Sequence, residues 1–199
     1  MNKGTIIGVI VAAVVIGGIL ASPLFYETEI DEPLPVVLDK IESGLTLTKF
    51  SDMDDTSRQL IVEKMPDKVK EMVMDEAAKF PISVSEEIDV MGDEQRIVLQ
   101  KSGNFDGLAG HYAEGLAKII EIEGSTFLRF EDFEVTNGPD LRVYFTQDGD
   151  VKNGIHLEKL KGSKSNQNYE LNNIDIEQYN SVVIYCQPFG VFFGEAELT

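Results

Sequence analysis

The hydrophobic pattern of the chain changes its period part-way along. Between Ile61 and Phe80, apolar residues return every three or four positions, which predicts helices with one apolar face. Pro66 interrupts this stripe and suits the first turn of a second helix, while Pro81 ends it. From about Gln95 the period becomes two, which is typical of strands.

The second half reads as many short strands that turn signals separate. Asn137-Gly138 and Asp148-Gly149 are such turns, and this spacing favours an antiparallel β-sandwich or barrel. The stretch from His111 to Ile122 fits a helix or a strand, and Gly115 together with the alternation that follows it favours a strand. The other expected strands are Ile97–Leu99, Thr126–Phe133, Leu141–Phe145, Ile155–Leu157 and Val182–Ile184.

The last stretch has the densest run of β-branched and aromatic residues outside the N-terminus. Val182–Tyr185 is apolar on both faces, which predicts a central strand of a packed sheet. Cys186, the only cysteine, would then lie at the end of that strand, inside or at the rim of the core. Pro188 and Gly190 predict a bend, after which Val191–Phe193 resumes an extended course.

The N-terminus carries a long apolar run without a charge. Gly4–Tyr26 is long enough for a helix to cross a bilayer, which takes about 20 residues. A cleaved signal peptide is the competing interpretation, but Leu20–Ser22 is a poor cleavage site, so a retained anchor is favoured. Lys3 precedes the run and acidic residues follow it. This charge bias predicts a cytoplasmic N-terminus and an extracytoplasmic remainder, in a single-pass cell-membrane protein.

Between the anchor and the strands, the pattern is less regular. Leu34–Leu38 and Leu45–Phe50 are expected as short strands or pairing arms, and Ser51 as the N-cap of the first helix. The predicted organisation is a transmembrane anchor (1–26), an acidic spacer (27–50), a helical segment (51–81) and a β domain (96–199). The fold class is therefore mainly β, an antiparallel sandwich or barrel preceded by a transmembrane helix and a short helical segment.

Charge and cysteine content narrow the classes of partner. The formal net charge of −18 argues against nucleic acid as a partner, because a phosphate backbone would be repelled. A single cysteine excludes an intramolecular disulfide and a cysteine-rich metal cluster. The sequence shows no catalytic triad and no phosphate-binding loop. The expected partners are membrane lipid, through the N-terminal helix, and a redox or surface protein.

The stretch from Gly103 to Leu198 resembles the DM-thirteen domain, the electron-transfer DM-thirteen family. The resemblance implies a β-sandwich-like extracytoplasmic module, often membrane-tethered, whose cysteine at the position of Cys186 does redox work as a bare thiol or through a prosthetic group. Tyr185 stands where the family often has tryptophan. The matching residues are Gly103, Phe105, His111, Gly115, Phe133, Asn137–Leu141, Val143, Tyr144, Leu160–Gly162, Asn166, Gln167, Tyr169, Tyr179, Ser181–Cys186, Phe189, Val191, Phe193, Gly194, Ala196 and Leu198.

Two interpretations of Cys186 stay open. A thiol becomes reactive beside a cation, a helix N-terminus or a metal, and the neighbouring sequence offers mainly aromatic residues, which favours a buried structural cysteine. Haem or a metal ion would join Cys186 to a second ligand, and His111 is the better candidate than His156. No such group is required. The residues expected to shape a pocket beside Cys186 are Asn137, Pro139, Asp140, Tyr185 and Phe189.

The sequence therefore leads to one functional hypothesis and one alternative. We expect a membrane-anchored electron-transfer or thiol-redox component of the cell surface, with Cys186 as the redox or ligating group and His111 as its helper. It would be a redox component rather than a classical enzyme. The alternative is a structural or adhesive binding module that uses Cys186 only for packing.

Overall fold

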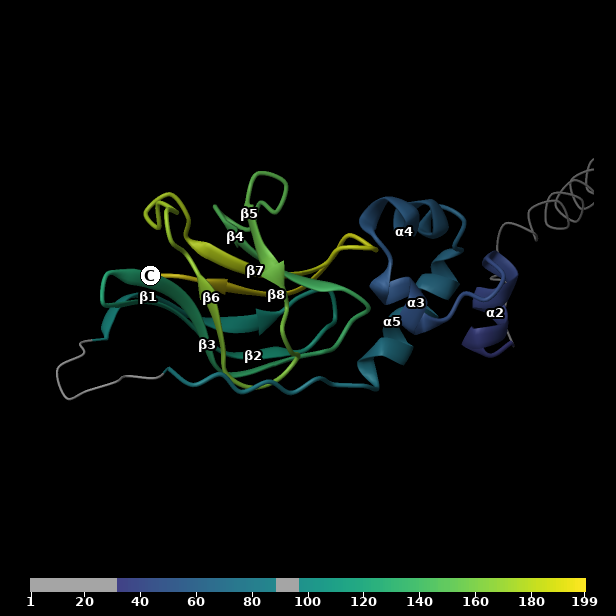
Figure 1. Cartoon of the computed structure of the whole chain (residues 1–199), viewed down its shortest axis with the longest axis horizontal. Coiled ribbons are helices and arrows are strands. Elements are labelled where there is room, and N and C mark those ends of the chain that lie inside the picture. The colour runs from purple at the N-terminus through teal and green to yellow at the C-terminus, as the bar shows by residue number, and fades with distance from the viewer. Residues whose placement is uncertain (1–31, 89–96) are drawn as a thin grey trace, which may run out of the picture. The chain divides into compact units, whose positions relative to one another are not determined.

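The computed structural model describes residues 32–88 and 97–199, in which a group of helices precedes a β-sheet (Figure 1). The predicted membrane span, Gly4–Tyr26, lies outside these residues. Within the described ranges, none of the helices has both the length and the apolar character that a bilayer crossing requires.

Four helices occupy the chain between Pro33 and Lys79. They are α2 (Leu34–Ile41), α3 (Leu47–Asp52), α4 (Asp55–Val62) and α5 (Asp67–Ala78). The stripe predicted for the helical segment is confirmed for five buried residues, whereas Phe80 at its end lies beyond α5 and is 61% exposed. The five buried residues are Ile61, Met65, Val69, Val73 and Ala77.

The structure predicted for the residues before this stripe is wrong. Leu34–Leu38 and Leu45–Phe50, expected as short strands, are largely helical because proline at the start of α2 and a capping threonine favour helix. Thr46 Oγ1 accepts a hydrogen bond from the Lys49 amide at 3.2 Å. The cap of α4 is Asp54, whose Oδ1 accepts from the Ser57 amide at 3.0 Å, whereas Ser51 lies inside α3.

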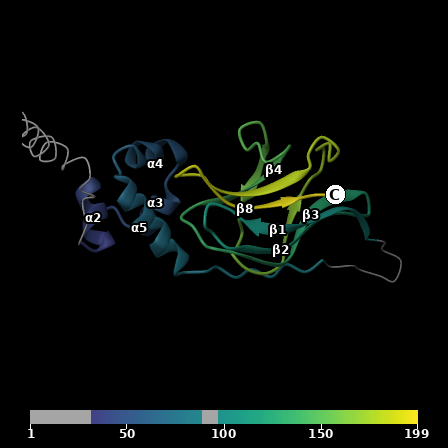
Figure 2. The same ribbon diagram turned by 180° about the vertical axis from the view of Figure 1, so that it is seen from behind.

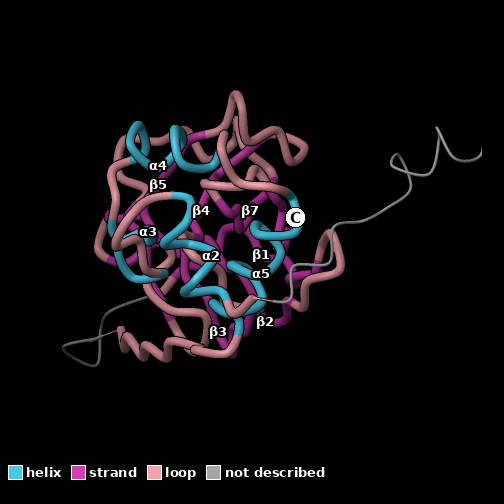
Figure 3. The backbone as a smooth tube through the Cα atoms, turned by 90° about the vertical axis from the view of Figure 1, so that its right-hand side faces the viewer, coloured by secondary structure: helices cyan, strands magenta, loops and turns pink. Residues whose placement is uncertain are grey.

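The β region forms one antiparallel sheet with the strand order β5-β4-β7-β8-β1-β2-β3-β6. Figure 2 shows the β region from behind. Its edge strands, β5 and β6, contact each other, so the sheet is nearly closed and curves around its core (Figure 3). This confirms the mainly β, antiparallel prediction. The strands are β1 (Val98–Gly107), β2 (Ala113–Ile122), β3 (Ser125–Val135), β4 (Leu141–Thr146), β5 (Ile155–Lys159), β6 (Gln167–Glu170), β7 (Ser181–Cys186) and β8 (Val191–Glu197).

The core lies between the inward faces of these strands. Strand β7 pairs with β4 on one side and β8 on the other, which confirms the prediction of a central strand. A side chain at Gly103 on β1 would bring its Cβ within 1.9 Å of the Glu197 carbonyl oxygen, so glycine permits this close approach of backbones. The large fully buried side chains of the sheet include Phe130, Phe133, Phe145, Tyr169, Ile184 and Phe193.

Candidate functional site

Cys186 is the last residue of β7, and its side chain is fully buried in the core of the sheet. Its cross-strand neighbours are Leu141 on β4 and Val191 on β8. The Gly190 amide donates to the Cys186 carbonyl at 2.9 Å and closes the turn. The predicted position of Cys186 is confirmed, and the predicted bend is a full reversal of the chain, the β7–β8 hairpin.

This burial determines the chemistry of the thiol. Desolvation raises the pKa of Cys186 to about 12, although the backbone of Phe189 acts in the opposite direction, and the carboxylate of Asp140 raises it further. A thiol with such a pKa stays protonated near neutral pH, and the thiolate is the form that attacks or binds metal. Cys186 is therefore a weak nucleophile in the folded chain.

His111 lies in the loop between β1 and β2, where its ring stacks on Phe193. The two ring centroids are 3.6 Å apart and the planes differ by 8°. Desolvation lowers the pKa of His111, and the charge of Asp75 partly offsets this. Within residues 97–199, no hydrogen bond or ring contact joins His111 to Cys186. The other histidine, His156 on β5, packs against Tyr144 with centroids 5.2 Å apart.

The residues around Cys186 do not fit a metal or haem site. In the described part of the chain, no group of three or more histidine, cysteine, aspartate or glutamate side chains is arranged to hold a metal ion. The Cys186 thiol is enclosed by core residues, whereas the ring of His111 stacks on Phe193 and that of His156 packs against Tyr144. We therefore assign no chemical step to a bound metal or haem.

Asn137 holds the end of a helix. Its Nδ2 donates to the carbonyl oxygen of Ala77, in the last turn of α5, at 3.2 Å and to that of Phe80, two residues after the helix, at 2.8 Å. The Ala77 carbonyl also accepts from the Phe80 amide at 3.1 Å, so the Asn137 side chain adds a second partner at this helix end. The turn predicted for this loop thus also attaches α5 to the sheet, and Pro139 lines a pocket on its helical side.

Asp140 lies at the centre of a buried charge cluster, formed by Asp55, Arg58, Asp140 and Arg142. The Asp140 side chain is 1% exposed, and its Oδ2 forms an ion pair with Arg58 Nη2 at 2.7 Å and accepts a hydrogen bond from Arg142 Nη2 at 2.9 Å. Asp140 Oδ1 has no hydrogen-bond partner, and Lys159 Nζ lies 3.6 Å from it. Because Arg58 belongs to α4 and Arg142 to β4, the cluster fastens the helices to the sheet.

Asp55 completes the cluster from the N-terminus of α4. Arg142 donates to both of its carboxylate oxygens, and Arg58 Nη2 lies 2.8 Å from Oδ1. These contacts, with the Arg142 hydrogen bond the largest, lower the pKa of Asp55 from its ordinary value of 3.8. A carboxylate shifted in this way stabilises the fold above its unfolded pKa and loses that contribution as the pH falls through its folded pKa.

We therefore predict that Asp55→Asn reduces the acid sensitivity of the protein. The wild-type free energy of unfolding should fall between about pH 5 and pH 2, and the variant should show a shallower fall because it lacks this titrating group. Urea unfolding at several pH values measures both slopes. Asp52→Asn, which changes a carboxylate outside the cluster, is the control. Equal slopes for wild type and Asp55→Asn would contradict the prediction.

Tyr185 and Phe189 lie on different sides of Cys186. Phe189, in the turn, stacks on Phe50 of α3 with ring centroids 5.8 Å apart. Tyr185 points to the outer face of the sheet, because successive residues of a strand alternate between faces. There it contacts Tyr144 at 5.8 Å and Phe192 at 5.1 Å, in a pocket of about 410 Å³. Tyr185 thus lines a pocket on the outer face of the sheet, together with Tyr144 and Phe192.

Sequence reasoning missed the arginines of the cluster. The sequence signal for them is the rarity of arginine, since the chain has only four. The three arginines that the structure describes are all at most 8% exposed. Arg58 also lies three residues before Ile61, on the apolar stripe of the helices. A charged residue on such a stripe indicates a buried partner.

A second set of contacts joins Ile82 and Glu86, which precede the sheet, to β6 and the loop before it. Glu86 accepts from Lys161 Nζ at 3.0 Å and from the Asn168 amide at 2.8 Å. A Cβ at Gly162 would come within 2.9 Å of the Ile82 carbonyl oxygen, so this glycine permits close packing of the chain. Gln167 and Tyr169, which belong to the residues that carry the resemblance, lie in β6.

These observations define a nearly closed antiparallel β domain with one buried cysteine at a hairpin and with loops that bind the preceding helices. Residues 104–198 match the model of the family described as Electron transfer DM13. This part of the chain is therefore a DM13 domain, which confirms the resemblance seen in the sequence. The match begins within β1 and includes none of the helices. No curated protein and no solved structure matched the chain.

Proposed function

We propose that this protein is a membrane-anchored, extracytoplasmic component that takes part in electron transfer at the cell surface. The observation that carries the proposal is the match of residues 104–198 to an electron-transfer family. The uncharged run Gly4–Tyr26 and the acidic residues after it support the anchor and the orientation.

Cys186 is the proposed redox group, with His111 as its helper. The enclosure of the thiol and its pKa of about 12 disfavour exchange with soluble thiols, which requires an accessible thiolate. Any redox role of Cys186 in the folded domain therefore depends on electron exchange through the surrounding protein or on opening of the β7–β8 hairpin.

The same burial supports a second candidate function, a structural or adhesive binding module of the cell surface. In that case Cys186 serves as a small apolar core residue, which is the usual behaviour of a free buried cysteine. The two functions differ in whether the protein accepts electrons.

The test is protein-film voltammetry of the purified full chain, together with its visible spectrum. Electron transfer through Cys186 predicts a reversible wave in the wild type that Cys186→Ala abolishes, while far-UV circular dichroism shows that the variant is folded. Cys186→Ala suits this purpose because it keeps a small apolar side chain in the core. A colourless protein without a wave would overturn the electron-transfer proposal and favour the binding module. Flotation of the full chain with phosphatidylcholine vesicles tests the anchor.

A further inference from the structure

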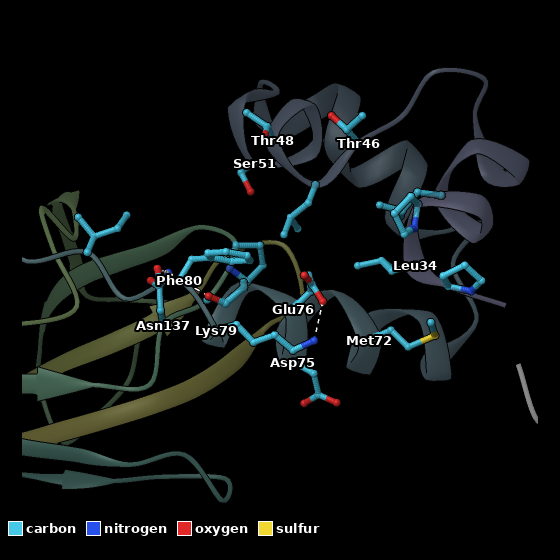
Figure 4. A pocket seen from close by; sticks show the side chains of 18 residues that line it. Leu34, Thr46, Thr48, Ser51, Met72, Asp75, Glu76, Lys79, Phe80 and Asn137 are labelled. Atoms are coloured by element: carbon cyan, nitrogen blue, oxygen red, sulfur yellow. Dashed lines mark hydrogen bonds and ion pairs between the residues drawn. The ribbon is translucent and has the colours of Figure 1, made fainter. Parts of the chain in front are cut away.

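A pocket of about 1020 Å³ lies between the helices and the loop at Asn137–Pro139 (Figure 4). Its volume is at the upper end of the range of ligand sites, about 300–1,000 Å³. The lining is mostly apolar and includes Leu34 from α2, Met72 from α5, and Phe80 and Ile82 from the segment after α5. The pocket therefore offers a long hydrophobic surface to a ligand.

Two large apolar side chains of this pocket are left open to solvent. Phe80 is 61% exposed and Ile82 is 54% exposed. Both are fixed through their backbones, because the Phe80 carbonyl accepts from Asn137 and the Ile82 amide donates to Ser163 Oγ at 2.9 Å. Exposed apolar side chains on a fixed backbone indicate a surface that a partner or ligand covers.

The polar groups of the pocket stand on opposite sides of it. Thr46, Thr48 and Ser51 supply hydroxyls on one side, and Asp75, Glu76 and Lys79 lie on the other (Figure 4). Lys79 Nζ is held by Glu76 Oε2 at 2.8 Å. Of the described lining residues, the one cation is thus already paired, and the chain carries a net charge of −18. These charges disfavour an anionic ligand and favour a neutral or zwitterionic one.

Two residues that line the pocket are close in sequence to the predicted membrane span. Pro33 and Leu34 line it, and only Glu27–Glu32 separates them from the end of the span at Tyr26. Six residues reach at most about 20 Å when fully extended. If the proposed anchor holds, the pocket is tethered within reach of the bilayer surface.

We propose that this pocket binds one hydrocarbon chain of a membrane lipid whose headgroup is neutral or zwitterionic. The proposal rests on the membrane anchoring of the proposed function. The hydrocarbon chain lies along the apolar lining beside Phe80 and Ile82, and the hydroxyls of α3 face the headgroup. A peptide or an anionic lipid fits the paired charges of the rim less well.

The experiment uses the full chain with phosphatidylcholine vesicles in which one acyl chain carries a diazirine. After photolysis, mass spectrometry locates the cross-linked residues. We expect labels on the pocket-lining residues, reduced about tenfold or more in Phe80→Gln/Ile82→Gln, because two apolar contacts are lost. Leu60→Gln is the matched control, since Leu60 on α4 is 57% exposed and lies outside the pocket. Its labelling should equal that of the wild type.

The possible outcomes distinguish a failure of the pocket proposal from a failure of the membrane anchor. If the chain floats with the vesicles but carries label only in residues 1–32, the pocket proposal is wrong and the anchor stands. If it does not float, the anchor is wrong, and titration of the full chain with short-chain phosphatidylcholine below its micelle concentration decides about the pocket. Saturable binding that the double variant weakens supports the pocket, whereas no binding, or binding that the double variant leaves unchanged, overturns it.

Discussion

In the folded full chain, Cys186 should react with iodoacetamide about a thousandfold more slowly than in the chain unfolded in urea at the same pH. Burial raises the pKa of Cys186 from 9.0 to about 12, and each pKa unit reduces the thiolate fraction tenfold. The side chain is also fully buried, so steric exclusion adds to this protection. The rate is measured by mass spectrometry of quenched samples.

A matched control places the thiol at the surface. Ser57→Cys in the Cys186→Ala background puts the same group at an exposed position of α4, where labelling should be nearly as fast as in the unfolded chain. Native-state labelling of Cys186 within tenfold of this control would contradict the prediction. It would also show that the β7–β8 hairpin opens readily, which would strengthen the thiol-redox form of the proposed function.

Asp140→Asn should destabilise the protein by about 3–5 kcal/mol, the usual cost of removing one partner from a buried ion pair. The substitution keeps the shape of the side chain but removes the charge between Arg58 and Arg142, whose side chains are only 2% and 10% exposed. Urea unfolding of the full chain, followed by far-UV circular dichroism, measures the loss.

Two further variants test the physical reason. Lys159→Ala removes an exposed cation 3.6 Å from Asp140 Oδ1 and should change the free energy of unfolding by less than about 1 kcal/mol. Arg58→Met added to Asp140→Asn should recover part of the loss, because the unpaired buried guanidinium is gone. A cost below about 1 kcal/mol for Asp140→Asn would mean that water reaches the cluster.

The β domain and the place of Cys186 could be predicted because both follow from local patterns. The run Val182–Tyr185 is apolar on both faces and rich in β-branched residues, which is typical of a strand buried on both sides. Period-two alternation likewise located β2, β3 and β4. The prediction of strands at Leu34–Leu38 and Leu45–Phe50 was wrong because apolar runs this short fit either a strand or a helix. The residues at the helix ends, Pro33 and Thr46, decide between the two.

The roles of Asn137 and Asp140 could not be predicted, because their partners are far away along the chain. The Asn137 side chain binds the carbonyls of Ala77 and Phe80, which are 60 and 57 residues away. The carboxylate of Asp140 meets Arg58 of α4, which lies outside the stretch that resembles the family. A turn motif alone shows that the chain reverses, and only the tertiary fold shows what the side chains of the turn hold.

The buried charge cluster limits how far the chain can be truncated without loss of stability. A fragment trimmed to the family match, starting at Asn104, would discard about half of β1 and helix α4, which supplies Arg58 to Asp140. Asp140, Asn137 and Lys161 would each lose a partner at once. The smallest independently stable piece should therefore begin near Pro33, and homology boundaries alone would mislead anyone choosing a fragment for expression.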